Sequence, residues 1–215
     1  MATPVWLHFD PTSGELNDTI NVSADAHTGR KQRTYAGTVQ STGVTGASTI
    51  NITQEPKANF VQFTQSQVSA TKGGGQVNIT GTSNSSKLNF TMLSGGDMTV
   101  TISPTYTAGG KSTNNNTAID GDPGATAEYS FTITVTVPEN TTVDTRTATL
   151  KVEGTGTTGD DPMTVTAQVN IVQAAGDAYL WLNAENTTTA TVTIPQAGTP
   201  AQAVNVLSNV SWTVS

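Results

Sequence analysis

The chain has 215 residues, no cysteine and a net charge of −7, and only 12% of its residues are charged. Without cysteine there can be no disulfide, no thiolate metal site and no cysteine nucleophile. The nine Lys and Arg residues are scattered, which argues against a nucleic-acid partner, since nucleic-acid binding needs clustered positive charge. No apolar run approaches the roughly 20 residues of a membrane-spanning helix.

Apolar and polar residues alternate strictly in many short stretches, which is typical of half-buried β-strands. The longest stretch sets Phe131, Ile133, Val135 and Val137 against three threonines. Turn-forming Gly, Pro, Asn, Asp and Ser residues separate the stretches. About seven strands in each 100 residues predict an all-β fold of tandem immunoglobulin-like β-sandwiches. The predicted strands lie at 20–22, 77–79, 88–90, 98–102, 131–137, 150–152, 164–171 and 204–206.

An internal repeat relates the two parts of the chain. An Asn-Ile pair in a strand that ends in Gln, followed by an aromatic residue, occurs twice at an offset of 119 residues. Further matches lie upstream at offsets of 113 and 93 residues. The matched segments are 50–54 with 169–173, Phe60 with Tyr179, 33–36 with 146–149, and 9–11 with 102–104.

The repeat predicts one whole sandwich and one split sandwich. Residues 58–177 form a complete middle copy, residues 1–57 match the later part of a copy, and residues 178–215 begin another. The two end segments together therefore form a circularly permuted immunoglobulin-like domain, closed within one chain or completed by a neighbouring chain. A third possibility is that the chain was cut from a longer array.

The middle copy carries an inserted loop at 105–127, which has no counterpart between Pro11 and Asp18. Long polar loops on a sandwich often carry contacts, and they are equally often mobile. Tyr106 and Asn115 are the residues of this loop that we expect at a contact surface.

Strand alternation also predicts exposed aromatic side chains near the two ends of the chain. If Val5 and Leu7 face inward, then Trp6 and His8 face outward. Inward Leu180 and Leu182 likewise place Tyr179 and Trp181 on the surface, whereas Trp212 shares the parity of Val210 and Val214 and is expected in the core. Outward aromatic residues cover a sheet edge, anchor a protein contact or stack on sugar rings.

The sequence offers no convincing catalytic or metal site. His8 has no nucleophile-elbow glycine pattern near it, and the equivalent strand position in the middle copy is Thr101. The loops with Asp120, Asp122, Asp160 and Asp161 offer oxygen ligands but lack the spacing of a calcium loop. We therefore expect no enzyme activity, no cofactor and no metal.

The outer segments carry a pattern similar to a known family. Trp6-Leu7 followed by a Pro-x-Ser-Gly turn at 11–14, and later the strand at 50–54 ending in Thr-Gln, resemble the BACON domain (Bacteroidetes-associated carbohydrate-binding often N-terminal). The segment Asn209-Val210-Ser211-Trp212 supplies the part that precedes Trp-Leu in the family. The resemblance implies an immunoglobulin-like fold and an accessory role in gut Bacteroidetes proteins or the tailed phages that infect them.

These observations favour a non-enzymatic structural protein of a phage particle, an auxiliary or decoration protein on the capsid. Its partners would be capsid or other virion proteins, or neighbouring copies of itself. The start of the chain lacks the basic and apolar regions of a secretory signal, which predicts synthesis in a host cytoplasm and a place in the virion. The alternative is a carbohydrate-binding accessory module or an adhesin fragment of a secreted Bacteroidetes protein, located outside the cell or on its surface.

Overall fold

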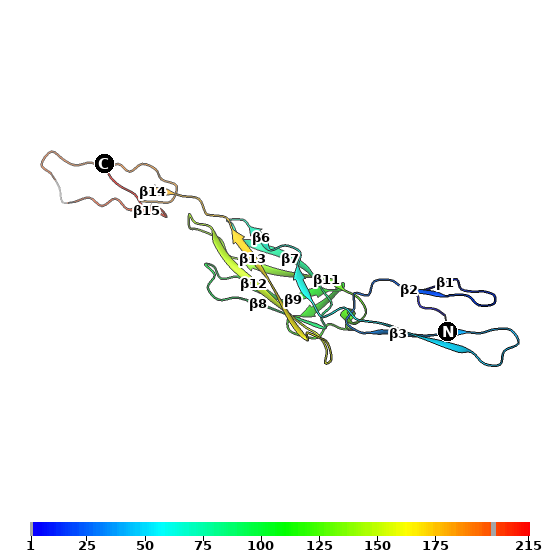
Figure 1. Cartoon of the computed structure of the whole chain (residues 1–215). Helices are drawn as coiled ribbons and strands as arrows, with labels where there is room; N and C mark the ends of the chain where they lie inside the picture. Colours follow the sequence, from blue (N-terminus) through cyan, green and yellow to red (C-terminus); the bar gives the residue numbers. More distant parts are fainter. Residues whose placement is uncertain (1, 199–200) are drawn as a thin grey trace.

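A computed structural model describes residues 2–198 and 201–215. Met1, Thr199 and Pro200, which belong to the predicted split domain, lie outside this range. The described part is built from β-strands and one short 3-10 helix, and it contains no helix long and apolar enough to cross a membrane. The chain is elongated, with a central sandwich and a smaller strand-containing segment at each end (Figure 1).

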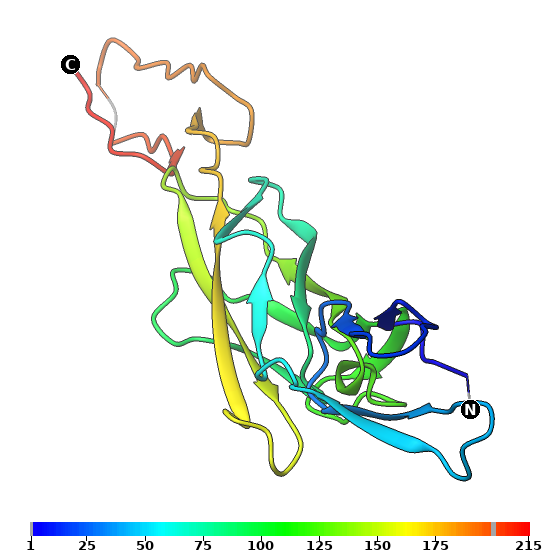
Figure 2. The ribbon, with the colours of Figure 1, turned by 45° about the vertical axis from the view of Figure 1, so that its right-hand side comes forward.

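The central domain, residues 58–177, is a two-layer sandwich (Figure 2). One sheet has five strands in the order β10-β9-β11-β7-β5, and the other has four in the order β6-β13-β12-β8. Neighbouring strands are antiparallel except β6 and β13, which are parallel. The strands are β5 (Val61–Phe63), β6 (Gln67–Ala70), β7 (Gly75–Ser83), β8 (Lys87–Met92), β9 (Thr101–Ala108), β10 (Lys111–Asn114), β11 (Tyr129–Val137), β12 (Arg146–Thr155) and β13 (Thr164–Gln173).

The predicted alternation produces the core of this domain. In β11 the four apolar residues from Phe131 to Val137 are buried, while the threonines between them face outward. Their partners from the facing sheet include Leu88, Phe90 and Leu150, and the Phe90 and Phe131 rings meet edge to face at 5.6 Å between centroids. The predicted all-β, immunoglobulin-like fold is confirmed.

The predicted loop at 105–127 is not a plain loop. Strand β9 continues past Pro104 to Ala108 and turns back into β10, and a 3-10 helix follows at Pro123–Ala125. The period-2 pattern of Thr105-Tyr106-Thr107-Ala108 explains this extension, since Tyr106 and Ala108 are buried between exposed threonines. The insertion therefore adds an edge to the five-stranded sheet.

The end segments form paired strands only. Residues 2–57, the N-terminal half, contain the pairs β1 (Leu7–Asp10) with β2 (Asn21–Ala24) and β3 (Arg33–Val39) with β4 (Ser48–Gln54). Residues 178–215, the C-terminal half, contain β14 (Leu180–Leu182) paired with β15 (Val206–Ser208).

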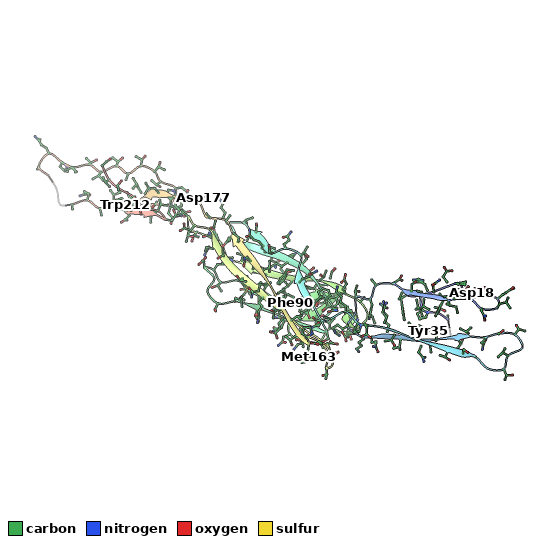
Figure 3. The ribbon with its side chains drawn as sticks, in the orientation of Figure 1. Asp18, Tyr35, Phe90, Met163, Asp177 and Trp212 are labelled. Carbon is green, nitrogen blue, oxygen red and sulfur yellow. The ribbon has the colours of Figure 1, made fainter. Side chains whose placement is uncertain are left out.

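The two halves lie at opposite ends of the central domain, with Trp212 far from Tyr35 and Asp18 (Figure 3). Strand β13 runs from the N-terminal half towards the C-terminal half, and ten strand residues span about 33 Å. Closure of the split domain within one chain is therefore not what the structure shows. Completion by a neighbouring chain stays a prediction.

Candidate assembly surfaces

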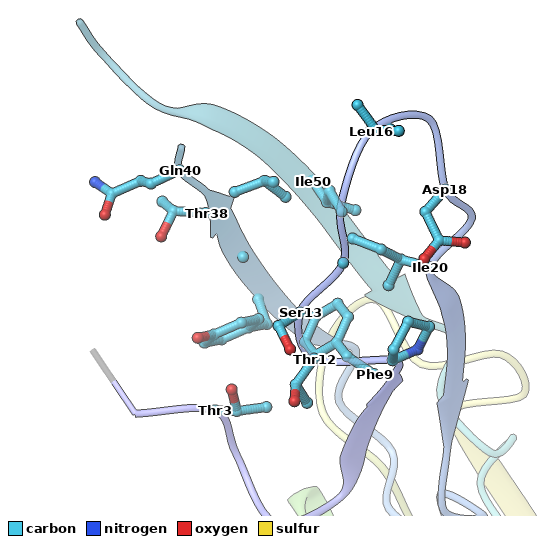
Figure 4. A pocket seen from close by; sticks show the side chains of 15 residues that line it. Thr3, Phe9, Thr12, Ser13, Leu16, Asp18, Ile20, Thr38, Gln40 and Ile50 are labelled. Atoms are coloured by element: carbon cyan, nitrogen blue, oxygen red, sulfur yellow. The ribbon is translucent and has the colours of Figure 1, made fainter. Parts of the chain in front are cut away.

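The N-terminal half is an open sandwich. Between its two strand pairs lies an open cavity of about 630 Å³, lined by apolar residues such as Phe9 and Ile50 and by polar ones such as Asp18 and Gln40 (Figure 4). Ile20, Val22 and Val39 are large apolar side chains that remain exposed. Clusters of exposed apolar side chains on a protein surface often mark a contact site.

The C-terminal half is open in the same sense. Large apolar side chains of its described residues are exposed, and among these residues the three-residue pairing of β14 and β15 is the only strand pairing. The exposed members are Leu180, Val192, Ile194, Val204, Leu207, Val210, Trp212 and Val214.

The β14–β15 pair repeats the β5–β7 pair of the central domain in register. Val61 lies opposite Ser83, and at the matching positions Leu180 lies opposite Ser208. The side-chain bonds repeat as well: Ser83 donates to the carbonyl of Phe60 at 2.8 Å, and Ser208 donates to that of Tyr179 at 2.9 Å. The C-terminal half is therefore the beginning of a sandwich that has the same design as the central domain.

The asparagine that follows each of these serines makes equivalent contacts. Asn84 Oδ1 accepts from the Phe60 N–H at 2.9 Å, and Asn209 Oδ1 accepts from the Tyr179 N–H at 3.0 Å. The amide nitrogen of Asn84 donates to the carbonyl of Thr28, and that of Asn209 donates to the carbonyl of Thr141. Both asparagines thus tie the start of a sandwich to the segment before it.

The N-terminal half repeats the later part of the central domain. Phe9 lies opposite Val22 as Ile102 lies opposite Val135. In the other strand pair the partners Arg33 and Gln54 correspond to Arg146 and Gln173. The N-terminal half thus resembles the later part of the central domain, and the C-terminal half resembles its beginning.

Arg30 connects the N-terminal half to the central domain. Its side chain is fully buried and donates to Asp122 at 2.7 and 2.8 Å and to Asp160 at 3.1 Å. It also donates to the Asn84 carbonyl at 3.2 Å. Nη2 donates to both carboxylate oxygens of Asp122 while Nε donates to Asp160, so two carboxylates fix the orientation of the guanidinium. We call Arg30, Asp122, Asp160 and Asn84 the Arg30 cluster.

Backbone contacts reinforce this junction. The N–H groups of Arg30 and Lys31 donate to the carbonyls of Gly124 and Ala125 at 2.9 and 3.0 Å. Gly29 has no room for a Cβ, which would meet the backbone of Thr126. The N-terminal half therefore packs against the inserted segment of the central domain.

Arg30 carries no signal in the sequence, because its partners come from three segments far apart in the chain. The loops with Asp122 and Asp160 stood out in the sequence as sources of oxygen ligands. The structure shows that these two loops converge on the guanidinium of Arg30. Among the described residues no group of acidic or histidine side chains is arranged to hold a metal ion.

Of the predicted surface residues, Trp6 and His8 lie together in the N-terminal half. Val5 is exposed rather than inward, because Val5 and Trp6 form a turn before β1 in which the Leu7 N–H bonds to the Pro4 carbonyl. The Trp6 ring lies under the Arg33 guanidinium at 5.6 Å, and His8 Nε2 is 3.0 Å from Asp25 Oδ1. Both residues already have partners within the half.

Tyr179 and Trp181 lie together on the C-terminal half. Their rings are stacked at 4.3 Å between centroids with an interplanar angle of 21°. Each side chain is partly exposed. The pair offers a flat aromatic surface on the outer face of β14.

Tyr106 and Asn115 do not form a contact surface. The Tyr106 ring is in the core against Phe90, its hydroxyl accepts from the Leu88 N–H, and burial raises its pKa. Asn115 bonds to both the N–H and the carbonyl of Phe90, at 2.8 and 2.9 Å. Asn115 thus covers the outer edge of β8, where an unpaired backbone would otherwise be exposed.

The described architecture is that of an immunoglobulin-like β-sandwich protein with open sandwich halves at both ends. Residues 2–55 match the family described as the viral BACON domain. The chain therefore carries a BACON-like domain, whose matched part is the N-terminal half. The matched family is a viral domain of structural or carbohydrate-binding type, a binding module rather than a catalytic one, and the match covers residues 2–55 alone.

Solved structures align with the chain only at low similarity. Cadherin-like domains 1 to 4 of zebrafish RET align with a TM-score of 0.34 and 10% identity, over 73% of this chain and 37% of that one. An endo-fucoidan hydrolase of glycoside hydrolase family 107 aligns with a TM-score of 0.33 and 18% identity, over 82% and 23%. The chain thus spans well under half the length of either, and the search of curated proteins finds no match.

Proposed function

We propose that the protein is a non-enzymatic structural protein of a phage particle, acting as an auxiliary or decoration protein on the capsid. The observation that carries the proposal is the combination of a viral BACON match at residues 2–55 with open apolar surfaces on both halves. Such surfaces suit a protein that works by assembly with others, because apolar area buried at a contact stabilises it.

The polar features of the chain support the same role. The best-organised charged group, the Arg30 cluster, is buried by its own chain and joins two segments, so it positions structure and is closed to a substrate. The tyrosines whose pKa burial raises, Tyr106 and Tyr129, donate to or accept from the backbone inside the core. Their protons are held too tightly for acid–base work near neutral pH.

Mass spectrometry of purified phage particles tests this proposal. We expect peptides of the chain in the particle band of a density gradient, in amounts comparable to other abundant capsid proteins. Recovery of the chain only from the soluble fraction of the lysate would contradict the proposal. A non-structural phage protein measured in the same fractions provides the control.

A second candidate function is carbohydrate binding, favoured by the stacked Tyr179–Trp181 pair. Flat aromatic surfaces stack on sugar rings. On a glycan array, this function predicts saturable binding that Trp181→Ala abolishes and that Trp6→Ala, whose ring is covered by Arg33, leaves unchanged. Absence of binding at millimolar glycan concentrations would rule the function out.

A further inference from the structure

We infer that the C-terminal half of one copy completes the N-terminal half of a second copy by strand exchange, so that copies join head to tail. The inference deepens the assembly role proposed above, and rests on it, by naming the partner as this chain itself. It follows from the repeat: apart from β10, which belongs to the insertion of the central domain, every strand that the N-terminal half lacks has its counterpart in the C-terminal half.

The first sheet shows the match. In the central domain β11 pairs with β7, with Ile133 opposite Ile79, and β7 in turn pairs with β5. The counterpart of β11 is β2 together with the residues that precede it. The counterpart of β7 is β15, and the counterpart of β5 is β14. The repeat offsets place Ile20 opposite Val204 of the second copy. Both side chains are exposed in the single chain.

The second sheet needs a parallel strand at the edge of β4. In the central domain β6 supplies this strand, with Ile171 opposite Val68. The counterpart of β6 is residues 191–194, where Val192 and Ile194 alternate with threonines but form no strand in the single chain. Translation of the register places Ile52 opposite Val192.

The turn after this segment supports the alignment. In the central domain the Gly74 N–H bonds to the Thr71 carbonyl at 3.0 Å, and Gly74 has a φ of 71°. In the C-terminal half the Gly198 N–H bonds to the Pro195 carbonyl at 2.9 Å, and Gly198 has a φ of 75°. The segment is therefore already shaped like the β6 turn while its strand partner is missing.

Gln54, in the N-terminal half, lacks contacts that its counterpart in the central domain makes. Its counterpart Gln173 is fully buried and donates to the carbonyls of Pro138, Thr71 and Lys72. Gln54 keeps the first of these contacts, as a 2.7 Å bond to Asp25. Thr71 and Lys72 correspond to Pro195 and Gln196, which the second copy would bring to it.

Trp212 provides the anchor for the open cavity. Its counterpart Phe90 lies opposite Val152 and is buried against the facing sheet. The counterpart of Val152 is Val39, which lines the cavity of the N-terminal half. The exchange thus places the indole of Trp212 over the cavity, where a buried tryptophan contributes a large apolar area.

The positions of the two halves indicate that the missing strands come from a second copy and not from the same chain. The two halves lie at opposite ends of the central domain, so one chain cannot complete itself (Figure 3). The contact is between different surfaces of two copies, and such contacts produce rings or open chains. Strand addition to an open edge provides its main-chain bonds.

Cysteine cross-linking of the full chain tests the register, since the protein has no cysteine of its own. In the central domain Thr134 lies opposite Asn78, and the two side chains bond at 2.7 Å on the outer face. The matching pair between copies is Asn21 and Ala203. Under mild oxidation, the double variant with Asn21→Cys and Ala203→Cys should give disulfide-linked multimers on a non-reducing gel.

The control pairs Asn21→Cys with Thr213→Cys, which corresponds to Thr91 in the opposite sheet. Packed sheets lie about 10 Å apart, beyond disulfide reach. Multimers from the first pair and not the control support the exchange, whether they form a ladder or one ring. A fast-migrating monomer linked within itself, equal multimers from both pairs, or no linkage would each overturn it.

Sedimentation velocity over a concentration series gives a second readout on the unmodified chain. We expect the mean mass to rise with concentration, and we expect Trp212→Ala to weaken association by about a hundredfold or more. A monomer at every concentration overturns the inference. Cross-linking without recovery in particles would contradict only the virion role, and recovery in particles without cross-linking would contradict only the exchange.

Discussion

The central domain and the two end halves follow one design, yet they differ in burial at equivalent positions. Phe90 is 1% exposed and its counterpart Trp212 is 50% exposed. Ile79 is 1% exposed and Val204 is 37%, while Ile133 is 0% and Ile20 is 39%. The first member of each pair lies in a paired strand of the sandwich, whereas Trp212, Val204 and Ile20 lie outside the strands of the end halves and have no facing sheet.

The difference shows how the sandwich is stabilised. Backbone pairing within a strand pair persists without the facing sheet, as β14 and β15 show. Burial of the apolar face requires both sheets, and it contributes about 1.5–3 kcal/mol for each large apolar side chain. The end halves therefore expose apolar surface in the single chain, and this surface stabilises the protein only when a partner covers it.

Phe90→Ala should break the central domain, and Trp212→Ala should leave a dilute single chain almost unchanged. Loss of a buried phenylalanine costs about 3–5 kcal/mol, whereas substitution of a side chain outside a core costs about 1 kcal/mol or less. Urea unfolding at low micromolar protein measures both. Equal losses in the free energy of unfolding would contradict the comparison.

The Arg30 cluster distinguishes the two junctions, because the C-terminal half has no buried arginine among the contacts that tie it to the central domain. Arg30→Ala leaves Asp122 and Asp160 without their partner, at a cost of about 3–5 kcal/mol for a broken buried pair. Hydrogen–deuterium exchange should accelerate at residues 28–31 and 122–126. Lys31→Ala, which removes an exposed charge next to Arg30 and keeps the backbone N–H that bonds to Ala125, is the control and should change exchange little.

The paired asparagines offer a smaller and matched test. Asn84 is fully buried and its amide nitrogen faces three backbone carbonyls, so Asn84→Asp should cost about 2–3 kcal/mol. Asn209→Asp changes the equivalent group in a half-buried setting and should cost less than half as much. Thermal unfolding of the two variants gives the order, and a reversed order would contradict the account.

The smallest effect at neutral pH concerns Tyr129, whose pKa burial raises well above its usual value near 10. The unfolded chain releases this proton first, so the stability contributed by the protonated hydroxyl is present below pH 10 and lost as pH rises above it. Unfolding measured from pH 8 to 11 should show this decline. Tyr129→Phe, which also loses the bond to the Ser85 carbonyl, should show a flatter dependence on pH.

Much of this fold could be predicted from the sequence, because period-2 alternation reports burial directly. The strands of the central domain and the correspondence of residues 50–54 with 169–173 both follow from local patterns. Tyr106 differs from its expected place in a surface loop, because β9 continues past Pro104 to Ala108 and buries the ring. Extending the same alternation past the proline would have placed Tyr106 in the core.

The Arg30 cluster could not be predicted in the same way. Its guanidinium meets Asp122 and Asp160, which approach through two separate loops whose relative positions depend on the whole sandwich. The arrangement of the two halves has the same cause. Sequence matching predicts that they complement each other, and only the path of the chain through the central domain shows that they lie apart.

Tryptophan fluorescence tests the central claim most directly. In the full chain with Trp6→Phe and Trp181→Phe, Trp212 is the single tryptophan that remains. The account predicts that its emission moves to shorter wavelength as protein concentration rises, because the half-exposed indole enters the sandwich of a second copy. An emission maximum that stays constant from dilute monomer to the highest soluble concentration would contradict the claim.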